Sequence, residues 1–111
     1  AVATGKGRGG LDKAIAQTDT QAFWLETACA GEYPSKPAPD MVLALCDRLG
    51  VEPKEAVVVG DTTHDLEMAA NAKIRAIAVA TGAHTAQQLS SMPHVAILNS
   101  LAELPDVLET L

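Results

Sequence analysis

Short apolar runs alternate with stretches of helical periodicity along the whole chain. Strands are expected at residues 1–4 (AVAT), 27–30 (TACA), 56–60 (AVVVG), 75–80 (RAIAVA) and 94–98 (HVAIL). Residues 5–17 are expected to form a glycine-rich turn that enters a helix, and further helices are expected at residues 39–49 and 63–72, in a short segment after residue 85, and from about residue 101. This alternation predicts an α/β fold, in which helices cover both faces of a parallel sheet. Such a sheet binds ligands at the carboxyl ends of its strands.

Two of these elements have clear sequence signals. The helix at 39–49 begins at a proline and stops at Gly50, and its apolar positions fall on one face: Val42, Leu45, Cys46 and Leu49. The strand at 56–60 is a continuous β-branched run, which is typical of a strand buried on both faces of a parallel sheet.

Composition limits the size of the fold and the class of its partners. With 111 residues the chain is one domain at most, and 48% of it is apolar although it holds only one Phe, one Trp and one Tyr. The core is therefore expected to consist of Ala, Val, Leu and Ile, with Phe23 and Trp24 as core or interface filler. The formal charge of −6 argues against nucleic acid or an anionic membrane as the main partner, since both favour clustered Lys and Arg. A small anion or a cation fits better.

The cysteines and the lengths of the apolar runs indicate the compartment. Cys29 and Cys46 are isolated in apolar surroundings, without CxxC or metal-ligand spacing, so buried free thiols in a reducing cytosol are expected. No apolar run reaches the roughly 18 to 20 residues of a membrane span, and no signal sequence opens the chain. The sequence is therefore interpreted as that of a soluble, cytoplasmic protein.

Two aspartates four positions apart follow the β-branched run in VVVGDTTHDLEMA, residues 57–69. Asp61 comes just after the strand and Asp65 lies in the first turn of the next helix. Gly60 is expected to allow a tight turn that brings both side chains to the rim of the sheet, the edge at which the strands end. Paired carboxylates repel each other unless a cation lies near them, and Mg²⁺ is the usual one because it prefers oxygen ligands. The simpler alternative is that Asp61 only ends the strand and Asp65 only favours the helix N-terminus electrostatically.

A cation and a hydroxyl group are expected at the same rim. Lys36 is held between Ser35 and Pro37 in a loop that follows a strand, where its ammonium group can meet a phosphate. Thr4 ends the first strand, and Gly5 begins a run of backbone N–H groups that can hold an anion.

The three histidines are weaker candidates. His64 is expected at the surface of an exposed helical turn, and His94 directly precedes a strand. His84 follows a strand end and is a candidate for the same rim as the two aspartates.

The order of these features resembles the haloacid dehalogenase (HAD) superfamily of phosphohydrolases, and most of all its phosphoglycolate-phosphatase-like branch. The features are a strand-end Thr, a Lys-Pro loop ahead of a helix, and VVVGDTTHDLEMAANA. The resemblance extends from Thr4 to Leu111 and implies a three-layer Rossmann-like core with a parallel sheet.

The resemblance also implies an activity: Mg²⁺-dependent hydrolysis of a small phosphorylated metabolite, with phosphoglycolate as the first substrate to test, through a phosphoaspartyl intermediate. It assigns catalytic roles to Thr4 and Lys36, and it adds Gly5 and Lys6 to these two as the residues that bind substrate. The acidic pair, Asp61 and Asp65, corresponds to the family's Mg²⁺ ligands.

One motif of the family is missing. Its reaction starts at a DxDx[TV] motif on the first strand, whose first aspartate attacks the phosphoryl group, but the nearest pattern here is QTDT at 17–20, which follows a helix. Residues 1–111 are therefore interpreted as the carboxyl-terminal part of a HAD core that lacks the nucleophile strand and the cap, and the chain alone is expected to be inactive. A smaller departure is Lys73, at a helix end where relatives often have glycine.

The missing strand has a structural consequence. In the family it lies between the strand that carries Thr4 and the strand at 56–60, so its absence exposes two inner strand edges. The two edges could pair directly, a neighbouring chain such as a homodimer partner could supply a strand, or a further segment of the same protein could fill the gap. The last two are favoured, because direct pairing would displace Thr4 from Asp61.

Two alternatives from other classes stay open at this point. Gly5, Gly7 and Gly10 match GxGxxG between a strand and a helix, which is the pattern of a dinucleotide-binding module. That fingerprint requires an acidic residue near the end of the next strand, whereas Glu26 precedes the expected strand. The second alternative is a non-catalytic domain that binds phosphate or Mg²⁺.

Overall fold

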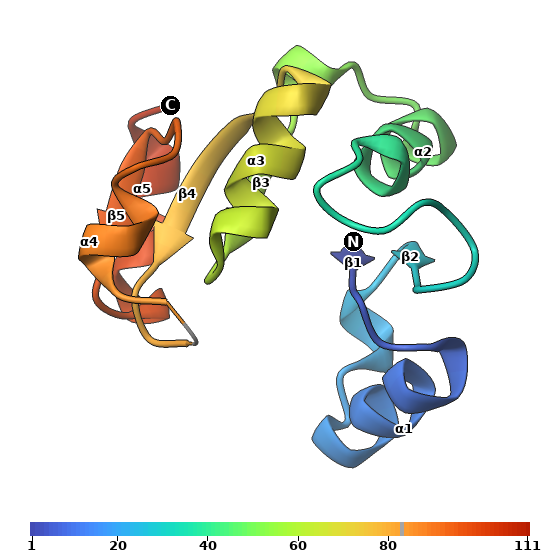
Figure 1. Cartoon of the computed structure of the whole chain (residues 1–111). Helices are drawn as coiled ribbons and strands as arrows, with labels where there is room; N and C mark the ends of the chain where they lie inside the picture. The colour runs from blue at the N-terminus through green and yellow to red at the C-terminus, as the bar shows by residue number, and fades with distance from the viewer. Residues whose placement is uncertain (83) are drawn as a thin grey trace.

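The structure is a computed structural model that describes residues 1–82 and 84–111, so residue 83 of the expected loop at 81–85 lies outside the described part. The elements follow in the order β1 (Val2–Ala3), α1 (Arg8–Thr18), the 3₁₀ turn η1 (Gln21–Phe23), β2 (Thr27–Ala28), α2 (Asp40–Leu49), η2 (Pro53–Glu55), β3 (Val57–Gly60), α3 (Thr63–Ala72), β4 (Arg75–Val79), α4 (Ala86–Leu89), β5 (Ala96–Leu98), η3 (Leu101–Glu103) and α5 (Leu104–Glu109) (Figure 1). Each expected strand and helix is present, which confirms the α/β fold.

The strands form two separate parallel sheets. In the first, β1 pairs with β2 and places Val2 opposite Thr27. In the second, β4 lies between β3 and β5, with Ile77 of β4 opposite Val59 of β3. Within the described residues no strand pairing joins β1 to β3, and Figure 1 shows the two sheets side by side with a gap between them. The direct pairing that the sequence interpretation disfavoured is therefore not observed.

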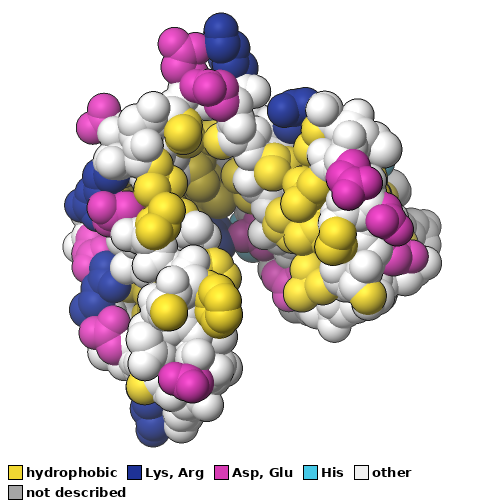
Figure 2. Space-filling model, turned by 180° about the vertical axis from the view of Figure 1, so that it is seen from behind, with side chains coloured by type: hydrophobic (Ala, Val, Ile, Leu, Met, Phe, Trp, Pro, Cys, Tyr) yellow, Lys and Arg dark blue, Asp and Glu magenta, His cyan; other side chains and the backbone are white. Residues whose placement is uncertain are grey.

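The gap between the sheets is an apolar groove of about 330 Å³. Its walls are the N-terminal segment with β1 on one side and β3 on the other, and α2 supplies apolar side chains that include Leu45 and Leu49. Figure 2 shows the hollow with hydrophobic side chains gathered along both of its sides. Asp65 also lines the groove.

The groove explains why β3 is less buried than its sequence suggests. The β-branched run predicts burial on both faces, but Val57 and Val58 are only half-buried and Val59 is 39% exposed. The prediction is wrong because β3 is an edge strand here, since it pairs with β4 alone. Each of the three valines lines the groove.

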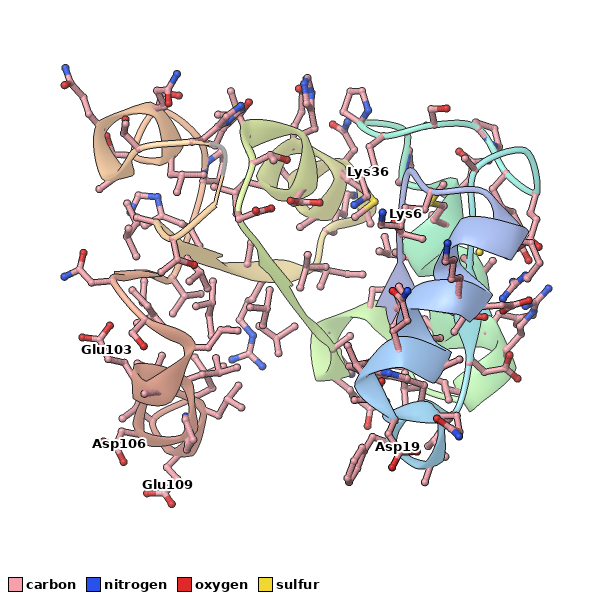
Figure 3. The ribbon with its side chains drawn as sticks, turned by 90° about the horizontal axis from the view of Figure 1, so that it is seen from below. Lys6, Asp19, Lys36, Glu103, Asp106 and Glu109 are labelled. Atoms are coloured by element: carbon pink, nitrogen blue, oxygen red, sulfur yellow. The ribbon has the colours of Figure 1, made fainter. Side chains whose placement is uncertain are left out.

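The main core lies beneath α2 and α3, which pack against each other. Its largest fully buried side chains include Met41, Leu66 and Met68. Ala76 and Ala78 of β4 belong to the same cluster, and their small side chains allow α3 to lie close to the strand. The helix α5 lies on the opposite side of β4 from α3 (Figure 3), which gives the three layers that the resemblance implies.

The helix ends follow the sequence signals closely. The bounds of α3 are those expected, and α2 begins one residue later than expected, with Pro39 as its N-cap residue. Gly50 ends α2 with a φ of 70°, in the left-handed region that glycine favours. Lys73 ends α3 in the same region with a φ of 60°, which is the strained geometry expected of a residue that replaces glycine there.

Both cysteines are buried free thiols, as expected. Burial raises the pKa of Cys29 and of Cys46, so neither thiol is activated as a nucleophile. Phe23 and Trp24 are expected to fill either the core or an interface, and the core role is wrong because Phe23 is 75% exposed and Trp24 is exposed as well. A role at an interface stays a prediction. Both residues lie at η1, outside the packed layers, where the Trp24 indole N–H donates to Thr20 Oγ1 at 3.0 Å. No helix in residues 1–82 and 84–111 is both long and apolar enough to cross a membrane.

Candidate functional site

The site begins at the carboxyl end of β1. The N–H of Thr4 donates to the carbonyl of Ala28 at 3.0 Å, which extends the pairing with β2 by one residue and fixes the Thr4 backbone. The N–H of Lys6 then donates to Thr4 Oγ1 at 3.1 Å, and the Lys6 carbonyl accepts from the N–H of Ala30 at 3.0 Å. Because Thr4 Oγ1 only accepts in this turn, its own proton remains able to donate to an anion.

The second part of the site is the N-terminal turn of α3, which is a capping box. Thr62 Oγ1 accepts from the Asp65 N–H at 3.3 Å, and Asp65 Oδ2 accepts from both the N–H and the hydroxyl of Thr62 at 3.1 and 2.9 Å. Asp65 is therefore held by the start of its own helix. The residue spacing that predicts a metal ligand also gives a helix cap.

Lys36 reaches the same carboxylate from the loop between β2 and α2. Its Nζ lies 2.6 Å from Asp65 Oδ1, and the two side chains are only 20% and 11% exposed. The loop is fixed to α3 by Asn71, whose side-chain amide donates to the carbonyl of Pro37 at 2.9 Å. Figure 3 shows Lys6 and Lys36 extending from separate loops toward the region between the two sheets.

The sequence predicts that a cation must offset the negative charge of the paired carboxylates. At Asp65 the cation observed is the ammonium group of Lys36. Burial by itself raises the pKa of Asp65, but the hydrogen bond and charge of Lys36, with the two hydrogen bonds from Thr62, outweigh burial and hold this pKa below its usual value. Asp65 is therefore ionised at neutral pH. The sequence did not predict this contact, because it assigned Lys36 to the phosphate and Asp65 to the metal.

The ion pair predicts a pH-dependent loss of stability. Because the pKa of Asp65 is lower in the folded than in the unfolded chain, the pair contributes its full stabilisation above about pH 4 and loses it as the pH falls further, through the folded-state pKa. Chemical denaturation of the intact protein at about pH 6 and at about pH 3 is expected to show a steeper loss for wild type than for Asp65→Asn. The exposed Asp47→Asn serves as a control with wild-type behaviour. Equal slopes for wild type and Asp65→Asn would refute the linkage.

Asp61 has a different environment from Asp65. It follows β3 directly and is half-buried, and its carboxylate has no hydrogen bond or salt bridge to any of the residues described. It lines a cavity of about 230 Å³ at the end of β3 and β4, together with Thr81 and Leu101. Of the two aspartates, Asp61 is therefore the one whose oxygens remain open to an added cation.

Gly60 has a role that the sequence interpretation missed. Its φ is not in the left-handed region, so a tight turn does not explain the glycine. An added Cβ would instead lie 2.6 Å from Cγ of Asp65, which is far inside van der Waals contact. The glycine is needed for space, because α3 brings the Asp65 side chain back against the end of β3.

The histidines lie where the sequence places them. His64 is exposed in the first turn of α3, and His94 precedes β5 with Nδ1 2.7 Å from the Met92 carbonyl. His84 lies beside the rim, where its Nδ1 accepts from the N–H of Thr63 at 3.0 Å. Its ring centre is 6.3 Å from that of His64. His84 thus fixes the loop after β4 to the start of α3.

Comparison with known proteins assigns this arrangement to a family. Residues 33–104, which include Lys36, Asp61 and Asp65, match the family model described as HAD-hydrolase-like. The chain belongs to the HAD hydrolases. The resemblance inferred from Thr4, Lys36 and the GDxxxD pattern is therefore confirmed. The alternative of a dinucleotide-binding module with Gly5 in its motif is not kept, because it leaves the GDxxxD pattern unexplained.

Named relatives of this HAD chain include phosphatases. It is 36% identical over 94 residues to the N-acylneuraminate-9-phosphatase of Mus musculus, covering 82% of the chain and 38% of that protein. It is 38% identical over 74 residues to the phosphoglycolate phosphatase of Chromobacterium violaceum, covering 67% of the chain and 32% of that protein. The chain thus spans about a third of the length of these relatives.

A solved structure confirms the fold over almost the whole chain. The HAD family hydrolase from Deinococcus radiodurans, crystallised with bound phosphate and sodium, superimposes with a TM-score of 0.88. The match covers 99% of this chain and 51% of that one at 22% sequence identity. The chain therefore corresponds in fold to about half of that hydrolase.

Proposed function

We propose that the intact protein containing this chain is a Mg²⁺-dependent phosphomonoester hydrolase that acts on a small phosphorylated metabolite. The observation that supports it most is the contact of Lys36 Nζ with Asp65 Oδ1 at 2.6 Å, beside an Asp61 carboxylate with no partner among the described residues. The proposal is supported by one fixed cation and one carboxylate without a described partner near the carboxyl end of β3. Phosphoryl transfer requires such groups, because it depends on positioning and on neutralising the phosphoryl oxygens.

The residues at the rim fit a magnesium ion. Mg²⁺ binds through one or two carboxylates and retains waters and substrate oxygens. Asp61 is the better-placed ligand because its carboxylate is open, whereas Asp65 already uses three of its roughly four acceptor sites on Lys36 and Thr62. In the proposal, Asp61 therefore binds the metal directly and Asp65 contributes its remaining acceptor site. When bound, the ion supplies positive charge for the phosphoryl oxygens.

No group of three or more metal-binding side chains occurs among residues 1–82 and 84–111. The proposal therefore requires further ligands from the substrate, from water or from another part of the protein. The family resemblance assigns the attacking aspartate to the missing nucleophile strand. That strand is proposed to fill the groove between β1 and β3, whose facing edges pair with no strand among residues 1–82 and 84–111.

The residues of this chain have defined tasks in the proposed reaction. The Thr4 hydroxyl donates a hydrogen bond to a phosphoryl oxygen, and the Gly5 and Lys6 loop lies against the same phosphate. Lys36, held in place by Asp65, neutralises the phosphate and the attacking carboxylate. The first aspartate of the missing motif attacks phosphorus while the bond from phosphorus to the ester oxygen breaks, and the second aspartate of that motif, the general acid and base that the resemblance assigns, protonates the leaving alcohol. Water, deprotonated by the same second aspartate, then hydrolyses the phosphoaspartyl intermediate to release phosphate.

A Mg²⁺ requirement tests the proposed function directly. The intact protein is expected to hydrolyse p-nitrophenyl phosphate and phosphoglycolate with Mg²⁺, to lose this activity after treatment with EDTA, and to regain it when Mg²⁺ is restored. The measurement is the release of inorganic phosphate. Turnover that survives metal removal would contradict the proposal. Binding of phosphate and Mg²⁺ without any turnover would support the non-catalytic alternative.

A further inference from the structure

The loop that follows β4 is fixed at both of its ends. At its start, the N–H of Ala80 donates to the Leu98 carbonyl of β5 at 2.8 Å. Near its other end, His84 Nδ1 accepts from the N–H of Thr63 at 3.0 Å, and Thr85 caps α4 by accepting from the N–H of Gln88 at 3.2 Å. The loop is thus anchored to a strand on one side and to the start of α3 on the other.

Between these anchors Gly82 lies against the carboxylate of Asp61. A Cβ added to Gly82 would lie 2.5 Å from Cγ and 2.7 Å from Cβ of Asp61, and closer still to Oδ2. The φ of Gly82 is outside the left-handed region, so its conformation is open to other residues. Gly31 and Gly50 show the opposite case, with a positive φ and nothing within 4 Å of an added Cβ. Gly82 is therefore required for space and not for backbone freedom.

The contact with Gly82 restricts the side chain of Asp61, which no other described residue holds by a hydrogen bond or a salt bridge. Asp65 is fixed by Lys36 and Thr62, whereas Asp61 has no such hydrogen bonds within residues 1–82 and 84–111. The backbone of Gly82 forms a wall on one side of the Asp61 carboxylate, next to the cavity that Asp61 shares with Thr81. The wall limits the orientations that the carboxylate can adopt, which lowers the entropy cost of binding a cation.

We propose that Gly82 is a positioning residue, whose backbone holds the Asp61 carboxylate toward the rim, and that His84 keeps the loop in place for this task. The idea rests on the proposed function, because it assigns to Asp61 the role of metal ligand. A side chain at position 82 displaces either the loop or the carboxylate, and the metal site is lost while the sheet remains intact.

The test compares Gly82→Ala with Gly9→Ala in the intact protein. Gly9 lies in α1 with nothing within 4 Å of an added Cβ, so it controls for the added methyl group. The Kd for Mg²⁺, measured by calorimetry with the metal alone, is expected to rise about 10- to 100-fold in Gly82→Ala and to stay unchanged in Gly9→Ala. Cooperative thermal unfolding is expected to show that both variants fold, with a slightly raised midpoint for Gly9→Ala because alanine favours the helix more than glycine does. In Gly82→Ala the Asp61 ¹³Cγ resonance is expected to shift in the metal-free protein.

A second variant covers the case in which Gly82→Ala does not fold. His84→Phe keeps a ring but removes the acceptor for Thr63, and a smaller rise in the Mg²⁺ Kd is expected. A folded Gly82→Ala variant with wild-type Mg²⁺ affinity and an unchanged Asp61 resonance would overturn the proposal. If the wild-type protein neither binds Mg²⁺ nor hydrolyses phosphomonoesters, the proposed function fails, and the Asp61 resonance alone then decides whether Gly82 positions this side chain.

Discussion

Lys36→Met is expected to lower the turnover of phosphomonoesters by the intact protein about 100- to 1000-fold, since one preorganised cation is lost from the phosphoryl group. The same substitution is expected to destabilise the protein by about 2 to 3 kcal/mol, because the Asp65 carboxylate has little contact with solvent and loses its partner. The loss is somewhat smaller than that for breaking a fully buried ion pair, because both side chains keep some exposure. Steady-state kinetics and urea denaturation measure the two effects separately. Turnover within tenfold of wild type in a folded Lys36→Met protein would contradict the proposed role.

The chain offers a matched control for this substitution. Lys54 also forms an ion pair, with Glu52 at 3.2 Å, but these side chains are 81% and 66% exposed. Lys54→Met is therefore expected to change stability by less than about 1 kcal/mol and to leave turnover unchanged. The double variant Lys36→Met with Asp65→Asn removes the isolated buried charge, so stability is expected to recover in part while turnover stays low. Recovery of both together would mean that Lys36 acts only through folding.

Residues 1–111 alone are expected to show no measurable phosphatase turnover. The proposed reaction needs an attacking carboxylate, and the charges at Lys36 and Asp61 supply no nucleophile. Phosphate release by the purified chain, compared with that of the intact protein at equal concentration, measures this directly. Hydrolysis by the pure chain that disappears in Asp61→Asn would show that the chain contains its own nucleophile.

Turnover is expected to return when the preceding segment of the protein is coexpressed as a separate polypeptide, since its strand can fill the groove. Co-purification of the two polypeptides measures assembly without reference to activity. Val59→Lys places a charge in the groove and is expected to prevent assembly, whereas Leu43→Lys on α2 is expected to have no effect. The two residues are matched in exposure, at 39% and 38%, but Leu43 lies outside the groove lining. Assembly that is insensitive to Val59→Lys would exclude the groove as the strand site.

The local structure of this protein was largely predictable. The periodicity of residues 39–49 and 63–72 predicted α2 and α3 almost to the residue, since the apolar stripe and the end signals both depend on near neighbours in the chain. The exposure of Val59 was not predictable from the same pattern. A β-branched run reports the preference of a strand for burial, while its actual burial depends on which strands pair with it.

The candidate site shows the same division. The sequence by itself determined that Thr4, Lys36, Asp61 and Asp65 follow strand ends or begin a helix, and the matched family model covers the last three of them. Only the tertiary structure decided that Lys36 pairs with Asp65, that Asp61 has no hydrogen-bond partner among the described residues, and that Gly82 lies against Asp61. The reason is physical: a contact between residues 29 positions apart, such as Lys36 and Asp65, depends on how the helices pack over the sheet. The spacing of residues along the chain specifies which side chains can lie at the rim of the sheet. The packing of the helices over the sheet decides which of these side chains contact one another.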